Sequence, residues 1–221
     1  MKPQIRLVGD AALALEWPAG GQANALARAL HARIKAFSAP GVLESLPALQ
    51  SLLVRFDPLR TDPDILKPLL MEFLNGLSGE EAPSGRNWRI PVCYHPDLAP
   101  DIEALAASTK MAVAQLVALH TGKDYTALFL GFLPGFAYLG GLDEALAAPR
   151  LARPRTSVPA GSVALAGGLT AVYPLESPGG WHLIGRTPVR MFDTSRPKPI
   201  LLAPGDTVRF FPISRSEFEA S

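Results

Sequence analysis

A polar interval at residues 78–87 separates two differently patterned regions of this chain, and it constrains the fold more than any other feature. The interval reads SGEEAPSGRN, and polar stretches that contain Gly and Pro are typical of linkers between domains. A chain of 221 residues is long enough for two small domains. We therefore predict an N-terminal domain over residues 1–80 and a C-terminal domain over residues 88–221.

The region before the interval favours a small α/β sandwich. Short apolar runs predict two strands within residues 5–17, one over 42–46 and one over 51–56. Apolar residues at a spacing of four predict a helix over residues 25–37, with Asn24 as its cap. A second helix is expected to begin at Asp62 or Asp64, with Pro68 confined to its first turn.

The region after the interval changes its pattern along its length. A strand is expected over residues 88–92, followed by helices over 101–107 and 111–120. Ser108 or Thr109 is the expected cap of the second helix, and Gly122 can close it. Short β-rich runs then alternate with Gly and Pro, at residues 127–132, 162–166, 170–173, 182–186 and 208–212. This pattern predicts an antiparallel barrel with functional loops, and an α+β fold class for the whole chain.

Charge and composition exclude several classes of function. The formal net charge of +1 gives no electrostatic case for nucleic acid or for an anionic membrane surface. The N-terminal residues lack the apolar segment of a secretory signal, and no apolar run reaches the length of a membrane span. Cys93 is the single cysteine, so a reducing compartment is favoured. We expect a cytoplasmic protein.

Three Gly- and Pro-rich stretches are the most informative part of the sequence. They are residues 131–141 (GFLPGFAYLGG), 154–162 (PRTSVPAGS) and 173–188 (YPLESPGGWHLIGRTP). Glycine permits unusual backbone angles and proline restricts loops, so polar groups on such loops can converge on a ligand. Turn-rich barrel structure without a site explains the same residues, and chemistry alone leaves both interpretations open.

These stretches resemble the signature of the family formed by the B subunits of 5-oxoprolinase. That family was formerly labelled allophanate hydrolase subunit 1 and includes a sporulation-kinase inhibitor. The similarity extends to residues 91–94 (PVCY) and 118–121 (ALHT). Residues 95–98 (HPDL) depart from the family, which more often has a longer Gly-containing loop there.

The resemblance implies a ferredoxin-like N-terminal domain and a cyclophilin-like C-terminal barrel. It also implies a hydrolase component that activates 5-oxoproline for ring opening to glutamate, with ATP as cosubstrate and no tightly bound cofactor. The implied partners are a protein resembling the C subunit of 5-oxoprolinase and a third, ring-opening component. The same family leaves open an inhibitor of a sensor histidine kinase, and its older label suggests a urea- or allophanate-related activity.

Four residues carry the candidate chemistry for this reaction. Arg155 and Arg186 offer planar forks of donors that suit the carboxylate of 5-oxoproline or the phosphates of ATP. The alternative for each is a structural bridge to Glu176 or to a loop carbonyl. Glu176 and His182 are the candidate catalytic residues, because a carboxylate can relay a proton and a histidine titrates near neutral pH. A loop-fixing acceptor and an ordinary strand histidine are the alternatives.

Three further side chains are expected to shape the pocket. Tyr138 can donate a hydrogen bond to a substrate carbonyl, and Ser157 and Ser177 can donate hydrogen bonds from the adjoining loops. A packed aromatic ring and turn-stabilising serines are the alternatives.

Other chemistries find no support in the sequence. Cys93 lies in a short apolar strand and is expected to be a buried thiol rather than a nucleophile. The four histidines are too widely spaced for a metal site, and His120 is expected to complement a helix C-terminus. Residues 195–198 (SRPK) match Ser-x-x-Lys only formally, because nearby prolines oppose the helix which that motif uses. The sequence contains no Gly-x-x-x-x-Gly-Lys-Ser/Thr phosphate loop.

Overall fold

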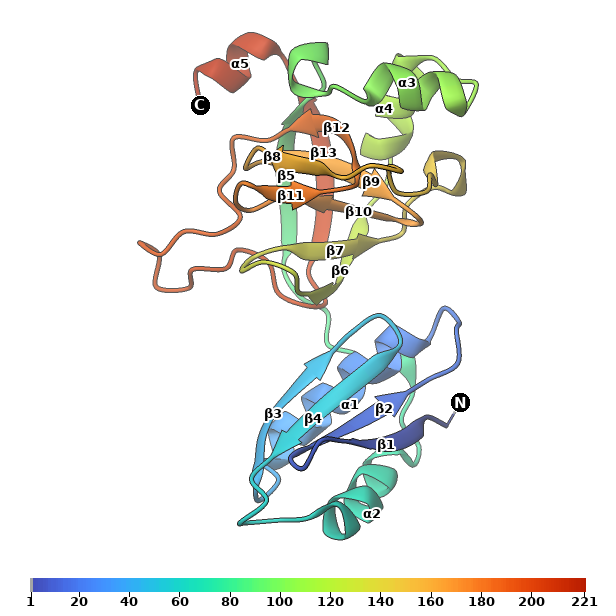
Figure 1. The fold of residues 1–221 in the computed structure, drawn as a ribbon, viewed down its shortest axis with the longest axis vertical. Helices are drawn as coiled ribbons and strands as arrows, with labels where there is room; N and C mark the ends of the chain where they lie inside the picture. The colour runs from blue at the N-terminus through green and yellow to red at the C-terminus, as the bar shows by residue number, and fades with distance from the viewer. Residues whose placement is uncertain (1) are drawn as a thin grey trace. The chain divides into compact units, whose positions relative to one another are not determined.

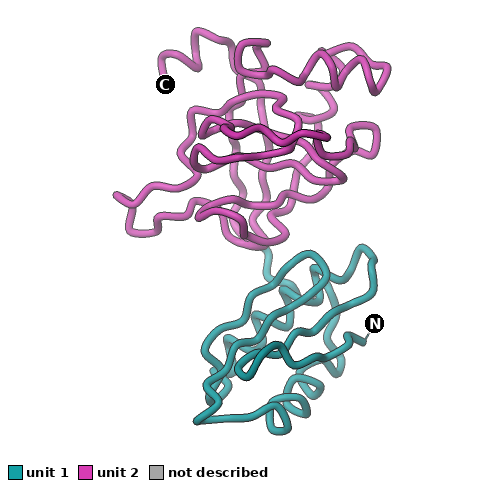
Figure 2. Tube along the Cα trace, viewed as in Figure 1, with its two compact units in different colours: residues 1–84 teal, residues 85–221 magenta. Residues whose placement is uncertain are grey.

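The computed structural model describes residues 2–221, and the chain forms two compact units (Figure 2). The first unit is Met1–Ser84 and the second is Gly85–Ser221. The predicted α+β fold class, a small sandwich followed by a barrel, is confirmed.

The first unit is an antiparallel sheet with the strand order β1-β2-β4-β3, packed against helices (Figure 1). Its elements are β1 Gln4–Val8, β2 Ala12–Glu16, α1 Ala23–Phe37, β3 Val42–Pro47, β4 Ser51–Phe56, α2 Pro63–Leu74 and the 3-10 helix η1 Gly79–Glu81. Alternation along β2 buries Leu13 and Leu15, which pack with Leu30 of α1 and Leu52 of β4. The period-two and period-four patterns in the sequence thus meet in one core.

Two details of these helices differ from the sequence predictions. Asn24 does not cap α1, because the helix already begins at Ala23; its side-chain amide donates to the Ala48 carbonyl at 2.9 Å instead. Asp62 does cap α2, accepting from the backbone amides of the two residues after Pro63. Pro68 lies inside α2 rather than in its first turn, and its missing N–H removes one helical hydrogen bond.

The second unit is built around a closed barrel with the order β10-β7-β6-β13-β5-β12-β9. Its strands are β5 Asn87–Cys93, β6 Tyr125–Leu130, β7 Ala137–Gly140, β9 Ser162–Ala166, β10 Leu169–Val172, β12 His182–Arg186 and β13 Thr207–Ile213. The pairing of β5 with β13 is parallel over seven residue pairs, from Asn87↔Thr207 to Cys93↔Ile213. The barrel is therefore mixed at this seam and antiparallel at its other pairings.

Short helices complete the second unit. They are η2 Pro96–Leu98, α3 Ile102–Ser108, α4 Val113–Thr121, η3 Glu144–Leu146 and α5 Arg215–Glu219. The prediction that Ser108 or Thr109 caps α4 is wrong. Their hydroxyls donate to the Leu105 carbonyl at 2.8 and 2.9 Å and close α3 instead. Gly122 ends α4 as predicted. Among residues 2–221 no single helix is long and apolar enough to span a membrane, and only α3 and α4 together, bent by 96°, pass on length and composition.

His120 of α4 lies in the barrel core rather than at a solvated helix end. It is 0% exposed and stacks on Phe210, with ring centroids 4.7 Å apart. Its Nε2 donates to the Thr170 hydroxyl at 3.1 Å, because that hydroxyl itself donates to the Ala164 carbonyl. Burial lowers the pKa of His120 from 6.5 to about 3, so the ring is neutral. The prediction that it complements the helix dipole is wrong, since that role needs a charged ring.

A small second sheet stands beside the barrel and carries much of the motif region. It pairs β8 Arg155–Val158 with β11 Ser177–Gly179. Val158 of β8 packs with Phe136, Tyr173 and Trp181 in an apolar cluster distinct from the main barrel core. This cluster fixes the three motif stretches against one another.

Candidate functional site

The three motif stretches meet around a cavity of about 260 Å³, here called the aromatic pocket. Its lining residues are Phe132, Phe136, Tyr138, Arg150, Pro154, Tyr173, Pro178, Gly179, Gly180 and Trp181. Each of the three stretches contributes to this lining. A concave, largely apolar cavity with a few polar groups is the usual form of a small-molecule site.

The walls of the aromatic pocket are rigid. Phe136 is 2% exposed and packs edge-on against Tyr173 and Trp181, with ring centroids 5.2 and 5.8 Å away. Tyr138 stacks on Phe129 at 4.2 Å. A Cβ at Gly179 would lie 2.3 Å from the Tyr173 hydroxyl, so only glycine permits this close approach. The cavity is therefore preformed by side chains that lock one another in place.

The polar groups of the aromatic pocket are hydrogen-bond donors. Burial raises the pKa of the Tyr138 and Tyr173 hydroxyls, and the positive charge of Arg150 opposes that rise at both. Both hydroxyls are therefore protonated at neutral pH. Arg150 adds a cation beside them, and no ion pair engages it among residues 2–221. The set suits a small ligand that carries a carbonyl and an anionic group.

Arg155 is engaged in a structural ion pair. Its Nη2 lies 2.5 Å from an oxygen of Asp101, and the other oxygen of Asp101 accepts from the Leu183 amide at 2.7 Å. The two side chains are 30% and 13% exposed, so the pair is largely shielded from water. Asp101, which the sequence analysis did not single out, thereby ties β8 to β12. This geometry favours a structural bridge, although the bridge is not to Glu176 or to a carbonyl.

Ser157 and Glu176 bind each other across the small sheet. The Ser157 hydroxyl donates to the Glu176 carboxylate at 2.9 Å, and both side chains are exposed. Ser177 is buried, and its hydroxyl has no hydrogen-bond partner within the described part of the chain. None of the three lines the aromatic pocket, although Ser177 directly precedes Pro178, which does.

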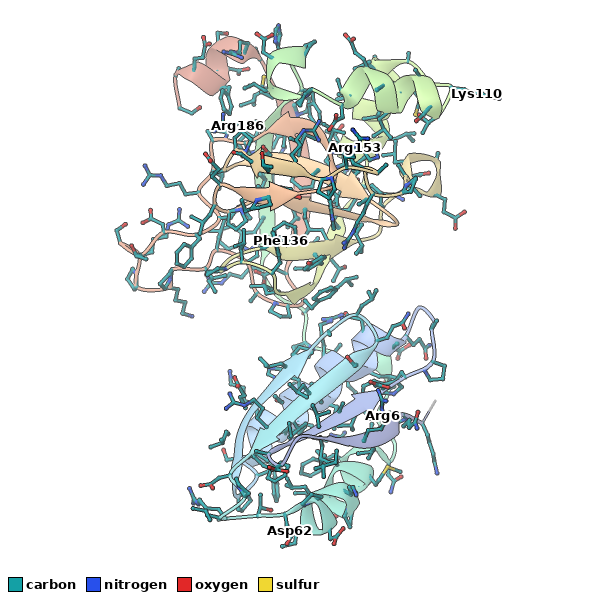
Figure 3. The ribbon with its side chains drawn as sticks, in the orientation of Figure 1. Arg6, Asp62, Lys110, Phe136, Arg153 and Arg186 are labelled. Atoms are coloured by element: carbon teal, nitrogen blue, oxygen red, sulfur yellow. The ribbon has the colours of Figure 1, made fainter. Side chains whose placement is uncertain are left out.

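His182 and Arg186 are held by loop carbonyls. The His182 Nε2 donates to the Pro149 carbonyl at 2.9 Å and so anchors the residue that precedes Arg150. The Arg186 Nε donates to the Ala160 carbonyl at 2.9 Å. Arg186 lines a different cavity, of about 340 Å³, which shares no lining residue with the aromatic pocket. Figure 3 shows Arg186 and Phe136 at separate positions on the second unit.

The structure thus divides the predicted site residues. Of the seven, Tyr138 alone lines the aromatic pocket, and Arg186 alone lines the second cavity. Sequence reasoning missed Arg150, which lies outside the three stretches, and of the aromatic residues within them it singled out Tyr138 alone. The signal for the aromatic wall was present, because Phe136 and Trp181 each directly follow a glycine in the motif and Tyr173 directly precedes a proline. Within residues 2–221 no group of three or more His, Cys, Asp or Glu could hold a metal ion.

Comparison with known proteins gives the family. The family described as "Carboxyltransferase domain, subdomain C and D" matches residues 3–202. The chain is 36% identical to the B subunit of 5-oxoprolinase from Bacillus subtilis (strain 168), over 98% of this chain and 95% of that protein. It is 39% identical to the B subunit of 5-oxoprolinase from Escherichia coli O157:H7, over 93% of this chain and 94% of that protein.

Solved structures share the fold of this chain. The protein TTHA0988 is 36% identical with a TM-score of 0.80, and the match covers 96% of this chain but 40% of that longer one. A conserved uncharacterized protein from Pyrococcus horikoshii is 40% identical with a TM-score of 0.59, over 97% of this chain and 100% of that one. Near full-length matches at these identities cover both units of the fold. The chain belongs to the family of 5-oxoprolinase B subunits.

Proposed function

We propose that this chain is the B subunit of an ATP-dependent 5-oxoprolinase and that its aromatic pocket binds 5-oxoproline. The observation that carries the proposal is the match to the B subunit of 5-oxoprolinase from Bacillus subtilis, at 36% identity over 98% of this chain and 95% of that protein. A match of this extent includes the barrel and all three motif stretches that line the pocket.

The aromatic pocket suits the chemistry of 5-oxoproline. This substrate is a five-membered lactam that carries one carboxylate, so it needs apolar walls, a donor for its carbonyl and a cation. Phe136 and Trp181 supply walls, the Tyr138 and Tyr173 hydroxyls supply donors, and Arg150 supplies the cation. A cation and a hydroxyl at fixed positions would orient the lactam for activation by ATP, which is the role that positioning has in phosphoryl transfer.

Residues beside the pocket are assigned supporting roles in this proposal. His182 anchors the Pro149 carbonyl and so positions Arg150. Glu176 keeps an exposed carboxylate two residues before Pro178 of the pocket, and proton handling is assigned to it. Arg155 acts through Asp101 by holding β8 in place. Ser157 orients Glu176 through their hydrogen bond.

The chain works with partners in this proposal. Its relatives are designated subunits, and a partner resembling the C subunit of 5-oxoprolinase would complete the site for ATP-dependent activation. A third component would open the activated ring to glutamate. Shared sites of this kind gain orientation that neither chain supplies alone.

The test replaces the pocket cation in the assembled enzyme. Arg150→Gln removes a charge-assisted hydrogen bond of about 1.5–3 kcal/mol, so the KM for 5-oxoproline should rise roughly tenfold or more. Arg153→Gln is the matched control, because Arg153 is an exposed arginine three residues away that does not line the pocket. Glutamate release at varied 5-oxoproline measures both variants. If the KM values were equal for Arg150→Gln, Arg153→Gln and wild type, the proposal that the aromatic pocket binds 5-oxoproline would be contradicted.

A further inference from the structure

A second cavity on the same unit has the chemistry of an anion site. This cavity, here called the arginine pocket, has a volume of about 340 Å³. The residues that shape it for an anion are Gly161, Arg186, Thr187, Arg190 and Phe218. They come from the end of β12, the loop that follows it, the turn before β9, and α5. Among the described residues, the lining contains two arginines and no Asp or Glu side chain.

Arg186 is held in place while its outer donors stay free. Its Nε donates to the Ala160 carbonyl at 2.9 Å, and its guanidinium carbon lies 6.0 Å from the centre of the Phe218 ring. Its two terminal nitrogens have no hydrogen-bond or ion-pair partner in the part of the chain that the structure describes. Arg155 has the opposite arrangement, because its guanidinium is paired with Asp101 at 2.5 Å. Arg186 is thus an oriented cation without a counter-ion.

Arg190 is a second, weakly paired cation at the arginine pocket. Its side chain is 78% exposed and its ion pair with Asp193 is long, at 3.8 Å. Asp193 is shared with Arg196 at 3.8 Å and accepts the Ser195 hydroxyl at 2.7 Å. One carboxylate divided among these donors does not neutralise Arg190.

The acidic residues of the neighbouring helix α5 do not neutralise the pocket either. Glu217 accepts from the Ser214 amide and hydroxyl, each at 2.7 Å. Glu219 accepts from the Arg215 Nε at 2.7 Å. Both carboxylates are therefore turned to partners on their own helix, and neither forms an ion pair with Arg186 or Arg190 in the described part of the chain.

The pocket floor depends on a close backbone approach. Gly161 has a φ of +82°, and a Cβ there would lie 2.4 Å from the Thr187 carbonyl oxygen. The Thr187 amide donates to the Gly161 carbonyl at 2.9 Å, which locks the turn onto the end of β12. The backbone on either side of Arg186 is therefore fixed, and the direction of its side chain with it.

We propose that the arginine pocket binds a phosphate group. Two guanidinium groups with free donor edges suit an anion that has several acceptor oxygens and more than one negative charge, because each planar fork can bind two oxygens. A phosphate meets this requirement on more than one face, whereas a carboxylate offers a single pair of oxygens. This inference rests on the proposed function only in that ATP is the phosphate-bearing cosubstrate; the source of the phosphate is either the nucleotide or free phosphate.

The experiment measures binding to the full chain alone, without partners and without turnover. Inorganic phosphate, ATP and 5-oxoproline are titrated separately by isothermal calorimetry into wild type, Arg186→Lys, Arg190→Gln and the control Arg153→Gln. Arg186→Lys keeps the charge but loses the fork, so the Kd for the phosphate ligand should rise roughly tenfold. Arg190→Gln changes an exposed side chain, so it keeps the test valid even if Arg186→Lys folds poorly. Thermal unfolding checks each variant.

The outcomes distinguish ATP from free phosphate as the ligand, and they test the phosphate site separately from the proposed function. Weakened ATP binding in both pocket variants assigns the pocket to the nucleotide, and weakened binding of inorganic phosphate without any ATP binding assigns it to free phosphate. The proposal would be overturned if Arg186→Lys and Arg190→Gln both bound phosphate and ATP as tightly as Arg153→Gln does. It would also be overturned if neither ligand bound to wild type. Because the readout is binding, it stands apart from glutamate release, on which the proposed function depends.

Discussion

Replacing Asp101 with alanine removes the group that holds β8 and β12 together. Asp101 accepts from the Arg155 guanidinium at 2.5 Å and from the Leu183 amide at 2.7 Å, with only 13% of its own side chain exposed. Asp101→Ala leaves a shielded arginine charge unpaired and an amide without its acceptor. Loss of one partner of a buried pair destabilises by about 3–5 kcal/mol, and a lost acceptor adds about 1–3 kcal/mol. Because Arg155 is 30% exposed and water can reach it, we expect the total at about 3–4 kcal/mol.

Urea unfolding followed by circular dichroism measures this free energy. Asp101→Asn should lose less than Asp101→Ala, because its amide oxygen still accepts from Leu183. Asp97→Ala is the control: Asp97 is 70% exposed, its ion pairs with His95 and Arg215 are 3.4 and 3.7 Å long, and such surface pairs contribute about 0–1 kcal/mol. An Asp101→Ala variant no less stable than Asp97→Ala would refute the role given to this pair.

Two further predictions concern the pH dependence of stability and the opposing effects of one substitution on stability and on substrate binding. Burial lowers the pKa of His120 from 6.5 to about 3. Below pH 6.5 the unfolded chain therefore takes up a proton that the folded chain does not. The free energy of unfolding should fall by about 1.4 kcal/mol per pH unit as the pH is lowered toward 3. Urea unfolding of His120→Gln should lack this component of the slope and His95→Gln should keep it, whereas equal slopes would contradict the assignment. Phe132 lines the aromatic pocket, is 61% exposed and has a φ of 68°. Phe132→Gly should relieve about 1–2 kcal/mol of backbone strain and cost about 0.5–1 kcal/mol through glycine's greater flexibility in the unfolded chain. Because the pocket loses one of its lining side chains, the KM for 5-oxoproline should rise. A destabilisation above about 1 kcal/mol, or an unchanged KM, would count against that reading.

Sequence patterns predicted the strands and helix caps that depend on interactions between neighbouring residues. The strand over residues 182–186 and the Asp62 cap of α2 depend on neighbouring residues, and both predictions are confirmed. The strands β7, β8 and β11 were missed, because each is short and none alternates apolar and polar residues. Their strand geometry comes from pairing with distant partners rather than from propensity.

The roles of individual side chains were harder to predict, because distant partners decide them. Arg155 meets Asp101 across 54 positions of sequence, and His120 meets Thr170 across 50. Neither partner shows a distinctive pattern in the sequence. Arg150 presented the same difficulty, since its place at the aromatic pocket depends on the fold of the loop around it.

Reconstitution with omissions tests the central claim most directly. The chain is combined with a partner resembling the C subunit of 5-oxoprolinase and with the third component, and glutamate release from 5-oxoproline is measured with ATP, without ATP, and with each protein left out. The account predicts ATP-dependent release from the complete set, and none when this chain is omitted or when it is alone. Undiminished release without this chain, or full turnover by this chain alone, would contradict the account.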